Sequence, residues 1–303
     1  MTVLVNLIVA LGMVCAVPLG LRLIDPVRLR RAARLWPLAA VPGALCPWLP
    51  RGPAATVLAA LYAAAALALA GWAGARLRRT LARTPPGGGR LPDPAEAAVL
   101  TALVSPSVAA TALVAERAGY RLFGFDLDVL ALTVPHFHFA GFTAALVAGL
   151  VCRSPGTRRG ARWAAYAACS VPAGTLLVLL GYFVDDWAEL LGAVVLTTGM
   201  WAVALVTWRD LRPAARDRST ATLLAVSAAV LVVTMLLALW WATGEATGIV
   251  HPTLTWMAAT HGLGNALGFA LCSLLAWRRL TAATPMHPTS PSVAPAAAPA
   301  PRT

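Results

Sequence analysis

Long apolar runs dominate this chain, and their spacing predicts its structural elements. Runs of about 20 residues recur from end to end, separated by short segments rich in arginine, proline and glycine. A run of that length crosses the hydrocarbon core of a bilayer as an α-helix. The pattern predicts nine membrane-spanning helices, over residues 3–21, 35–49, 53–75, 96–115, 127–151, 163–183, 187–208, 220–242 and 254–277.

The composition supports the same fold class. Of the 303 residues, 59% are hydrophobic and 12% are charged, and the mean hydropathy is +0.74, which excludes an ordinary soluble globule. We therefore predict an all-α, polytopic transmembrane helix bundle in the bacterial cytoplasmic membrane. One transmembrane domain is expected over residues 1–280, followed by a disordered, cytoplasmic tail rich in proline and alanine over residues 281–303.

The basic residues predict the orientation of the bundle. All 24 are arginines, and with 12 acidic residues they give a net charge of +12. They form short clusters between the apolar runs, as the positive-inside rule describes, and not the single basic face of a nucleic-acid-binding protein. With the N-terminus outside and the C-terminus inside, 21 arginines are cytoplasmic and only Arg51, Arg117 and Arg121 are outside.

Three of the five histidines lie inside predicted spans, where an ionisable side chain is costly unless it faces a cavity or a partner. At about 1.5 Å per residue, His136 and His138 lie roughly 14 to 17 Å below the outer start of the fifth span. His261 lies roughly 10 Å below the start of the ninth span. We therefore expect the three imidazoles to share one layer in the outer half of the membrane.

The histidines belong to two motifs. The fifth span contains HFHFAGF at residues 136–142, and the ninth contains HGLGNALGF at residues 261–269. In this order, on a multi-span chain of this length, the motifs resemble those of the YndJ-like family of bacterial membrane proteins, from about the fourth span to the ninth. The resemblance implies a polytopic protein of poorly defined function. Its signature residues in this sequence are His136, His138, His261 and Asn265.

Helix geometry leaves two interpretations of the HFH segment open. On a straight helix His136 and His138 point about 200° apart, so both face one cavity only if the helix is locally disturbed. Pro135 can supply that disturbance because it removes a backbone hydrogen bond. The alternative is that one histidine faces the site while the other hydrogen-bonds a neighbouring helix.

His261 and Asn265 share one face of the ninth span because they are four residues apart. Gly264 and Gly268 form a small-xxx-small pair that permits close helix approach. Asn265 is predicted to orient a substrate or His261. The alternative is an interhelical clasp in which His261 and Asn265 tie the ninth span to the fifth.

Acidic residues collect at the predicted outer ends of the spans, and five are candidates for proton transfer in a cavity that opens outward. They are Glu116, Asp185, Asp186, Glu189 and Glu245. A carboxylic acid that is desolvated there can stay protonated and act as a general acid. The alternative for each is a solvated loop charge.

Aromatic residues crowd the same outer half and are candidates for a substrate-binding wall. They are Phe137, Phe139, Phe142, Trp240, Trp241, Trp256 and Phe269. Aromatic faces can stabilise a carbocation through cation–π attraction. Ordinary packing is the alternative.

These residues suggest an integral membrane enzyme. The sharpest version is acid-initiated cyclisation or isomerisation of a lipid-soluble, isoprenoid-like substrate, by general analogy with membrane-embedded terpene cyclases. A proton-coupled transporter is the second hypothesis, although no internal repeat is evident. The third is a haem or metal protein, with His136, His138 and His261 as ligands. No cofactor is predicted otherwise, and the expected partners are the bilayer and a small molecule.

Overall fold

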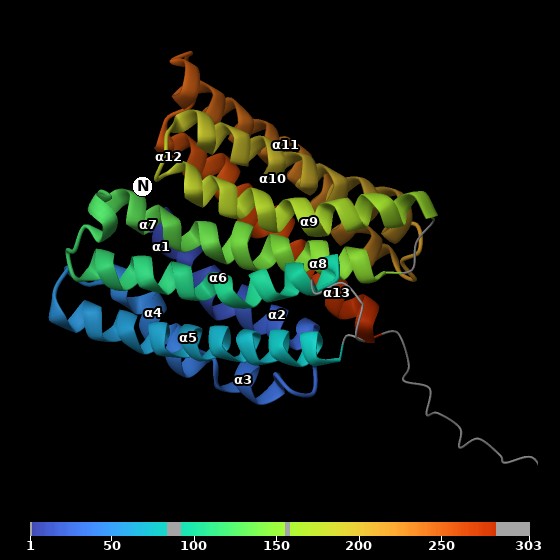
Figure 1. Ribbon diagram of the computed structural model, residues 1–303, viewed down its shortest axis with the longest axis horizontal. Helices are drawn as coiled ribbons and strands as arrows, with labels where there is room; N and C mark the ends of the chain where they lie inside the picture. Colours follow the sequence, from blue (N-terminus) through green and yellow to red (C-terminus); the bar gives the residue numbers. More distant parts are fainter. Residues whose placement is uncertain (1, 84–91, 155–157, 283–303) are drawn as a thin grey trace, which may run out of the picture.

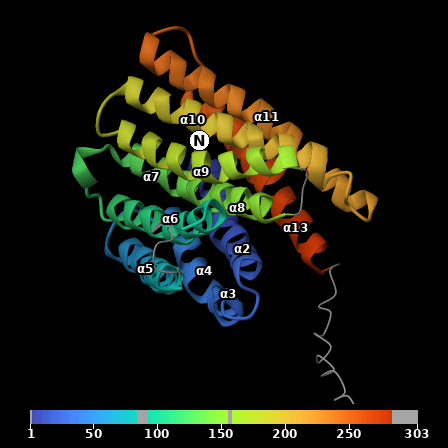
Figure 2. The ribbon, with the colours of Figure 1, turned by 45° about the vertical axis from the view of Figure 1, so that its right-hand side comes forward.

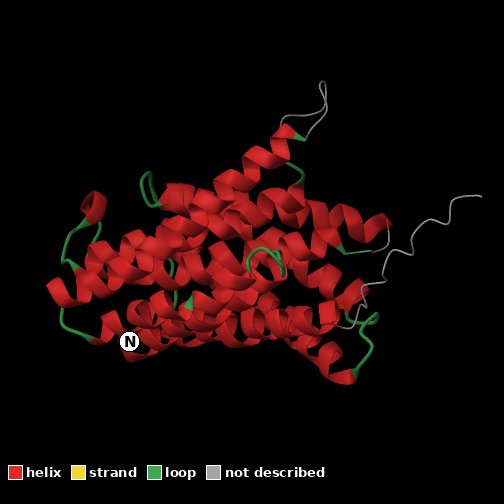
Figure 3. Cartoon of the chain, turned by 90° about the horizontal axis from the view of Figure 1, so that it is seen from below, coloured by secondary structure: helices red, strands yellow, loops and turns green. Residues whose placement is uncertain are grey.

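The chain forms a bundle of helices (Figure 1). The computed structural model describes residues 2–83, 92–154 and 158–282, and every regular element within these ranges is helical, as Figure 3 shows. This confirms the predicted all-α fold class. The tail predicted to be disordered lies outside the described residues from position 283 onward.

Eight helical segments of the described chain are long and apolar enough to cross a membrane, so this is a multi-pass membrane protein. Their bounds are Val3–Ile24, Pro53–Ala82, Pro94–Arg117, Leu127–Arg153, Arg158–Gly181, Asp186–Leu211, Arg218–Thr247 and Leu254–Ala282. All eight overlap predicted spans, because apolar length is the property that the bilayer selects.

Several of these segments change helix type along their length. The α-helices are α1 (Thr2–Ala10), α2 (Val17–Ile24), α5 (Pro53–Ala82), α6 (Pro94–Arg117), α7 (Leu127–His136), α8 (Ala145–Arg153), α9 (Arg158–Gly181), α10 (Asp186–Val206), α11 (Arg218–Thr247), α12 (Leu254–Met257) and α13 (Cys272–Ala282). Five π-helical segments interrupt or extend them: η1 (Leu11–Ala16), η4 (Phe137–Ala144), η5 (Thr207–Leu211), η6 (Ala258–Gly262) and η7 (Gly264–Leu271). A short 3₁₀ turn, η3 (Leu122–Gly124), precedes α7. Because η1, η4 and η7 contact one another, the irregular turns meet inside the bundle.

The second predicted span, residues 35–49, does not form one long helix. The region contains α3 (Arg30–Leu35), α4 (Pro37–Leu45) and the 3₁₀ turn η2 (Cys46–Trp48). The short apolar run carries Pro37, Pro42 and Pro47, which predict a kinked or tilted span and account for these breaks. Helix α4 of this segment nevertheless packs along α5 (Figure 1).

Polar contacts anchor this broken segment to its neighbours. The Asn6 amide donates to the Pro47 carbonyl at 3.2 Å, and the Trp36 indole donates to the Met13 carbonyl at 2.9 Å. At the end of α6, the Arg117 carbonyl accepts from the Gly52 amide at 3.0 Å. Such bonds satisfy backbone groups that a broken helix exposes inside a membrane.

The remaining helices pack in two flanks. Figures 1 and 2 show α9, α10 and α11 side by side along one flank and α3, α4 and α5 along the other. Helices α9 and α10 approach so closely that a Cβ atom at Gly174 would collide with the backbone of Leu196. Near the arginine-rich end, the buried Glu96 carboxylate binds Arg76 at 2.5 Å and Arg153 at 2.8 Å. This cluster ties α5, α6 and α8 together.

The first and last described residues lie at opposite ends of the bundle (Figure 1). The loops that follow α2 and η5 are at the arginine-rich end, whereas residues 182–185 and 248–253 connect helices at the acidic end. The assignment of the acidic end to the outside stays a prediction from the arginine distribution.

Candidate functional site

A cavity of about 560 Å³ opens at the acidic end of the bundle. Its walls come from α1, α7 with η4, α9, α10, α11 and the helix that begins at α12. Most of its lining is apolar, and its volume falls within the range of small-molecule sites. Exposed residues at its open end include Tyr182, Val184 and Leu254. The cavity therefore connects the surface with the interior of the bundle.

The cavity is elongated along the helices. On α10 its lining extends from Asp186 to Met200, which is about 21 Å at 1.5 Å per residue. We call this elongated space the channel. The carboxylates line its mouth, the histidines its middle, and residues such as Phe269 and Ala144 its inner end.

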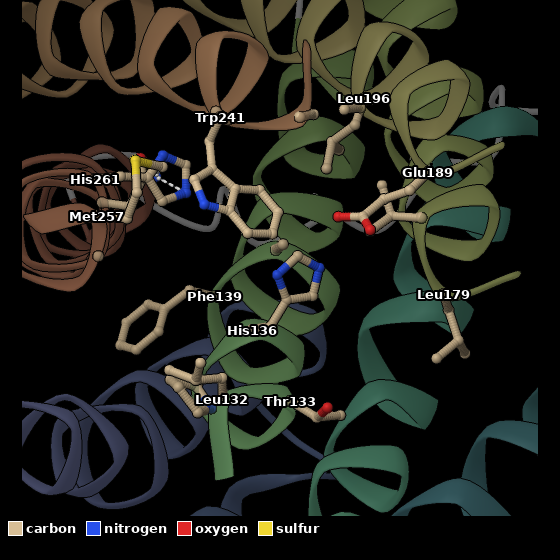
Figure 4. Close-up of a pocket in the computed structure, with 18 of the residues that line it drawn as sticks. Leu132, Thr133, His136, Phe139, Leu179, Glu189, Leu196, Trp241, Met257 and His261 are labelled. Carbon is tan, nitrogen blue, oxygen red and sulfur yellow. Dashed lines mark hydrogen bonds between the residues drawn. The ribbon is translucent and has the colours of Figure 1, made fainter. Parts of the chain in front are cut away.

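His136 is the most unusual residue in the wall. It ends α7 directly after Pro135, and the chain continues as the π-helical segment η4. Its imidazole lines the cavity, and its Nε2 atom is buried with no hydrogen-bond partner among the described residues. Buried polar atoms are normally paired, so an unpaired nitrogen on a residue of the cavity wall marks His136 as a candidate site residue. Figure 4 shows the ring projecting into the same space as Glu189 and Trp241.

His138 turns away from the cavity, although we predicted that it would share the layer with His136. Its side chain is fully buried, and its Nε2 lies 2.5 Å from the Tyr62 hydroxyl oxygen on α5. Its Nδ1 lies 2.7 Å from the Val134 carbonyl oxygen. Tyr62 then donates to Nε2 and Nδ1–H donates to the carbonyl, so both ring nitrogens are satisfied. The alternative interpretation, with one histidine at the site and one bonded to a neighbouring helix, is correct.

His261 and Asn265 both line the cavity, as predicted, and bind each other. The Asn265 amide nitrogen lies 3.2 Å from His261 Nε2, and His261 Nδ1 lies 2.8 Å from the Thr234 carbonyl oxygen. The Thr234 hydroxyl also donates to Asn265 Oδ1 at 2.8 Å. The clasp that we considered therefore exists, but it joins the ninth span to α11 and not to the fifth span.

The predicted glycine pair supports this clasp. A Cβ atom at Gly264 would lie 2.9 Å from Thr234 Cγ2, and one at Gly268 would lie 2.8 Å from Val230 Cγ1. Both glycines therefore face α11, and their missing side chains let the two helices approach closely enough for the hydrogen bonds. His261 is held by these bonds, whereas His136 is not.

Four of the five predicted carboxylates line the cavity: Asp185, Asp186, Glu189 and Glu245. Asp185 caps α10 by accepting from the Ala188 amide at 2.8 Å, and Glu245 lies 3.1 Å from His251 Nε2. Asp186 and Glu189 have no ion-pair partner within the described part of the chain. Glu189 faces the channel one turn below the mouth (Figure 4).

Glu116 lies elsewhere, so the structure does not bring it to the cavity. Its buried carboxylate binds the neighbouring Arg117 and, at 2.9 Å, Arg51. Arg117 also donates to the Cys46 and Leu49 carbonyls. A buried carboxylate with two guanidinium partners is a structural ion pair, and it ties the end of α6 to the broken second segment.

The aromatic prediction holds for part of the set. Phe137, Phe139, Trp241 and Phe269 line the cavity. Phe142 does not, because it is fully buried against Gly20. Trp240 and Trp256 do not line it either: they pack edge to face with ring centroids 6.4 Å apart and are about half exposed. Their position fits interfacial anchoring.

Sequence reasoning missed two residues near the mouth. Tyr182 lines the cavity, and partial burial, together with the carboxylates of Glu189 and Glu245, raises the pKa of its hydroxyl, which therefore stays a neutral donor. His251 packs edge to face on Trp241 at 6.3 Å between ring centroids and binds Glu245. Both lie in loops between helices, where no periodic pattern marks them.

The residues proposed as metal ligands do not converge. His138 is bound to Tyr62 on the far side of its helix, which removes it from any shared site with His136 and His261. No group of three histidine, cysteine, aspartate or glutamate side chains within residues 2–83, 92–154 and 158–282 is close enough to hold a metal ion. The structure therefore does not bring the three histidines together, and haem or metal binding stays a prediction.

Comparisons with known proteins agree with the motifs. The model of the family described as "YndJ-like protein" matches residues 7–269, so the chain belongs to this family. It is 27% identical over 165 residues to "Uncharacterized membrane protein YndJ" of Bacillus subtilis (strain 168). This alignment covers 54% of the chain but 29% of that relative, which is much longer. No solved structure matches.

Proposed function

We propose that this member of the YndJ-like family is a membrane enzyme that binds a lipid-soluble molecule in its cavity and moves protons on it. One observation carries the proposal: the imidazole of His136, whose Nε2 has no partner among the described residues, and the carboxyl group of Glu189 line the same largely apolar channel. A proton acceptor and a proton donor on different walls of one channel suit acid-initiated isomerisation or cyclisation.

The reaction balances with these two residues alone. The Glu189 carboxylic acid donates its proton to one carbon of a carbon–carbon double bond, which leaves a carbocation on the other carbon. His136 Nε2 then takes a proton from the carbon next to the cation, and the released electron pair forms the new double bond. The product is an isomer of the substrate. Transfer of the proton from His136 back to Glu189 through water at the mouth restores the enzyme.

The aromatic residues give this scheme its second support. The aromatic residues Trp241, Phe139 and Phe269 line the same channel. A cation near such faces gains about 0.5–2 kcal/mol, more where water is excluded. A branched, isoprenoid-like substrate fits best because protonation of its double bond gives a tertiary cation. In the cyclising version, a second double bond attacks this cation before the proton is lost.

Solvent deuterium tests the proposal. Membranes containing the full-length protein are incubated in D₂O with bacterial lipid extract, and the lipids are analysed by mass spectrometry. We expect an isomerised or cyclised lipid that gains one deuterium per turnover, because the donated proton comes from Glu189 in exchange with solvent. Glu189→Gln should lose this product. Asp128→Asn, which changes an exposed acid at the same end outside the cavity, is the control.

A proton-coupled transporter is the second candidate. It is supported by the succession of titratable groups from the mouth carboxylates to His136 in the middle of the channel. A transporter moves its substrate without changing it. Uptake that depends on Glu189 and His136, without any deuterium-labelled product, would favour this candidate over the enzyme.

A further inference from the structure

The mouth of the cavity carries a strong negative charge. Asp185, Asp186 and Glu245 line it, and Glu189, the proposed proton donor, lies one helical turn below. The basic partner that the three mouth carboxylates have within the described chain is the imidazole of His251, 3.1 Å from Glu245. The arginines of this end are engaged elsewhere, Arg51 and Arg117 with Glu116 and Arg121 with Asp126. Carboxylates without an arginine partner at the mouth of a low-dielectric channel attract cations.

The channel behind these carboxylates has the shape and polarity for a chain. Its lining extends about 20 Å along the helices and includes apolar side chains such as Leu196, Met200 and Phe269. A compact, polar ligand would leave this apolar length unfilled. A single extended chain, with its polar group at the mouth, would cover it.

Two features inside the channel point independently to a ligand. The imidazole of His136 lines the channel, and its buried Nε2 atom has no partner in the described residues. Three other buried side-chain atoms of the described chain also lack partners, on Ser170, Thr197 and Trp201, but none of those residues lines the cavity. The indole of Trp241 lies one helical turn below Glu245 and presents an aromatic surface beside the acidic mouth.

We propose that the cavity binds a single-chain amphiphile with a cationic headgroup, an amine or quaternary ammonium, with the headgroup at the carboxylates and Trp241 and the chain in the apolar channel. This inference rests on the proposed function only in using the same cavity. It places the ligand as a lipid lies in a leaflet, with its polar end at the surface and its chain in the interior. The headgroup remains at the mouth while the chain passes between Glu189 and His136.

Equilibrium binding tests this assignment. The full-length protein in phosphatidylcholine nanodiscs is titrated with radiolabelled dodecyltrimethylammonium, and empty nanodiscs are subtracted. Dodecanol and dodecyl sulfate compete with the same chain length but a neutral or anionic headgroup. We expect the cation to bind at least about 10-fold more tightly than either competitor, because only the cation gains from the carboxylates. Equal or tighter binding of dodecanol would overturn the proposal.

Matched variants separate the mouth from the general surface charge. The double variant Asp186→Asn, Glu245→Gln should weaken binding of dodecyltrimethylammonium about 10-fold, while Asp128→Asn should leave it unchanged. Trp241→Leu should weaken it about 5-fold and Trp240→Leu should not, because only Trp241 lines the cavity. Equal effects within either pair would show surface binding and overturn the proposal. Size-exclusion profiles confirm that each variant is folded.

The outcomes also separate this proposal from the proposed function. Cation binding without deuterium incorporation leaves the ligand class standing and removes the enzyme. Deuterium incorporation with preferential binding of dodecanol leaves the enzyme standing and removes the cationic headgroup. Failure of all three probes to bind in the cavity overturns the headgroup assignment together with the long-chain ligand on which it depends.

Discussion

His136 and His138 are two residues apart, yet their surroundings are opposite. His136 faces a channel and has a buried nitrogen without a partner. His138 is fully buried and bonded through both nitrogens, to Tyr62 and to the Val134 carbonyl. Side chains two residues apart on a helix point about 200° apart, so His136 and His138 lie on opposite sides of the fifth span. The same residue type in one motif therefore lines the cavity on one side of the helix and packs against neighbouring helices on the other.

The packing around each side reinforces the difference. A Cβ atom at Gly12 would lie 2.8 Å from His138 Cβ, so η1 fits closely against this histidine. Tyr62 in turn packs edge to face on Trp36, with ring centroids 5.7 Å apart. No such layer covers His136, whose side of the helix forms the cavity wall. Side chains that pack this tightly transmit any change in shape, whereas a cavity wall tolerates one.

The largest effect is expected from the cavity side. His136→Ala should lower the rate of deuterium incorporation at least about 100-fold, because it removes the proposed proton acceptor. The yield of monodisperse, detergent-extracted protein should stay at the wild-type level, since no hydrogen bond within the described chain is lost. Both quantities are measured on the same preparation. Normal activity with a reduced yield would assign His136 to packing and break the comparison.

His138→Ala should give the opposite result. It leaves a cavity in a close-packed region and deprives the Tyr62 hydroxyl of its acceptor, at a combined cost of about 3 kcal/mol. We expect a lower melting temperature and a lower yield, with near-normal deuterium incorporation per folded molecule. A variant that is stable but inactive would place His138 in the reaction, contrary to its position.

The fold was predictable because a bilayer requires apolar length, and apolar length is visible in sequence. The second segment differs from the other spans because Pro37, Pro42 and Pro47 lie within a run of only 15 residues. The stability of such a broken helix depends on contacts with other segments, such as the hydrogen bond from Arg117 to the Cys46 carbonyl.

The orientation of the bundle in the membrane remains a prediction. A single cysteine introduced at Trp187 should be labelled from outside the cell.

For the candidate site, the depth of the residues in the membrane was predictable, but the direction in which their side chains point was not. Residue counting placed His136 and His261 in a common layer, and both line the cavity. It did not determine which histidine faces inward, because that depends on the packing of η1 and α5 against His138. Glu116 and Glu189 looked alike in sequence, since both lie near a span end. The adjacent Arg117 was the local signal that Glu116 is neutralised.

A smaller effect on stability is expected at the contact between the ninth span and α11, where His261 is hydrogen-bonded. Gly268→Leu would push Val230 away from the ninth span and cost about 2 kcal/mol through overpacking. Gly71→Leu is the matched control, because no atom lies within 4 Å of a Cβ at that position. Thermal unfolding in detergent compares the two. Equal melting temperatures would mean that the close approach of η7 to α11 does not limit stability.

The smallest effect is expected from removing one hydroxyl group on the packed side. Tyr62→Phe keeps the ring against Trp36 and deletes only the donor to His138 Nε2, at a cost of about 1 kcal/mol. The melting temperature should fall by a few degrees, and deuterium incorporation should not change, because His136 keeps its surroundings. A double-mutant cycle with His138→Ala measures the coupling between the two side chains. Loss of activity in Tyr62→Phe with an unchanged melting temperature would show that the two sides of the fifth span do not act separately.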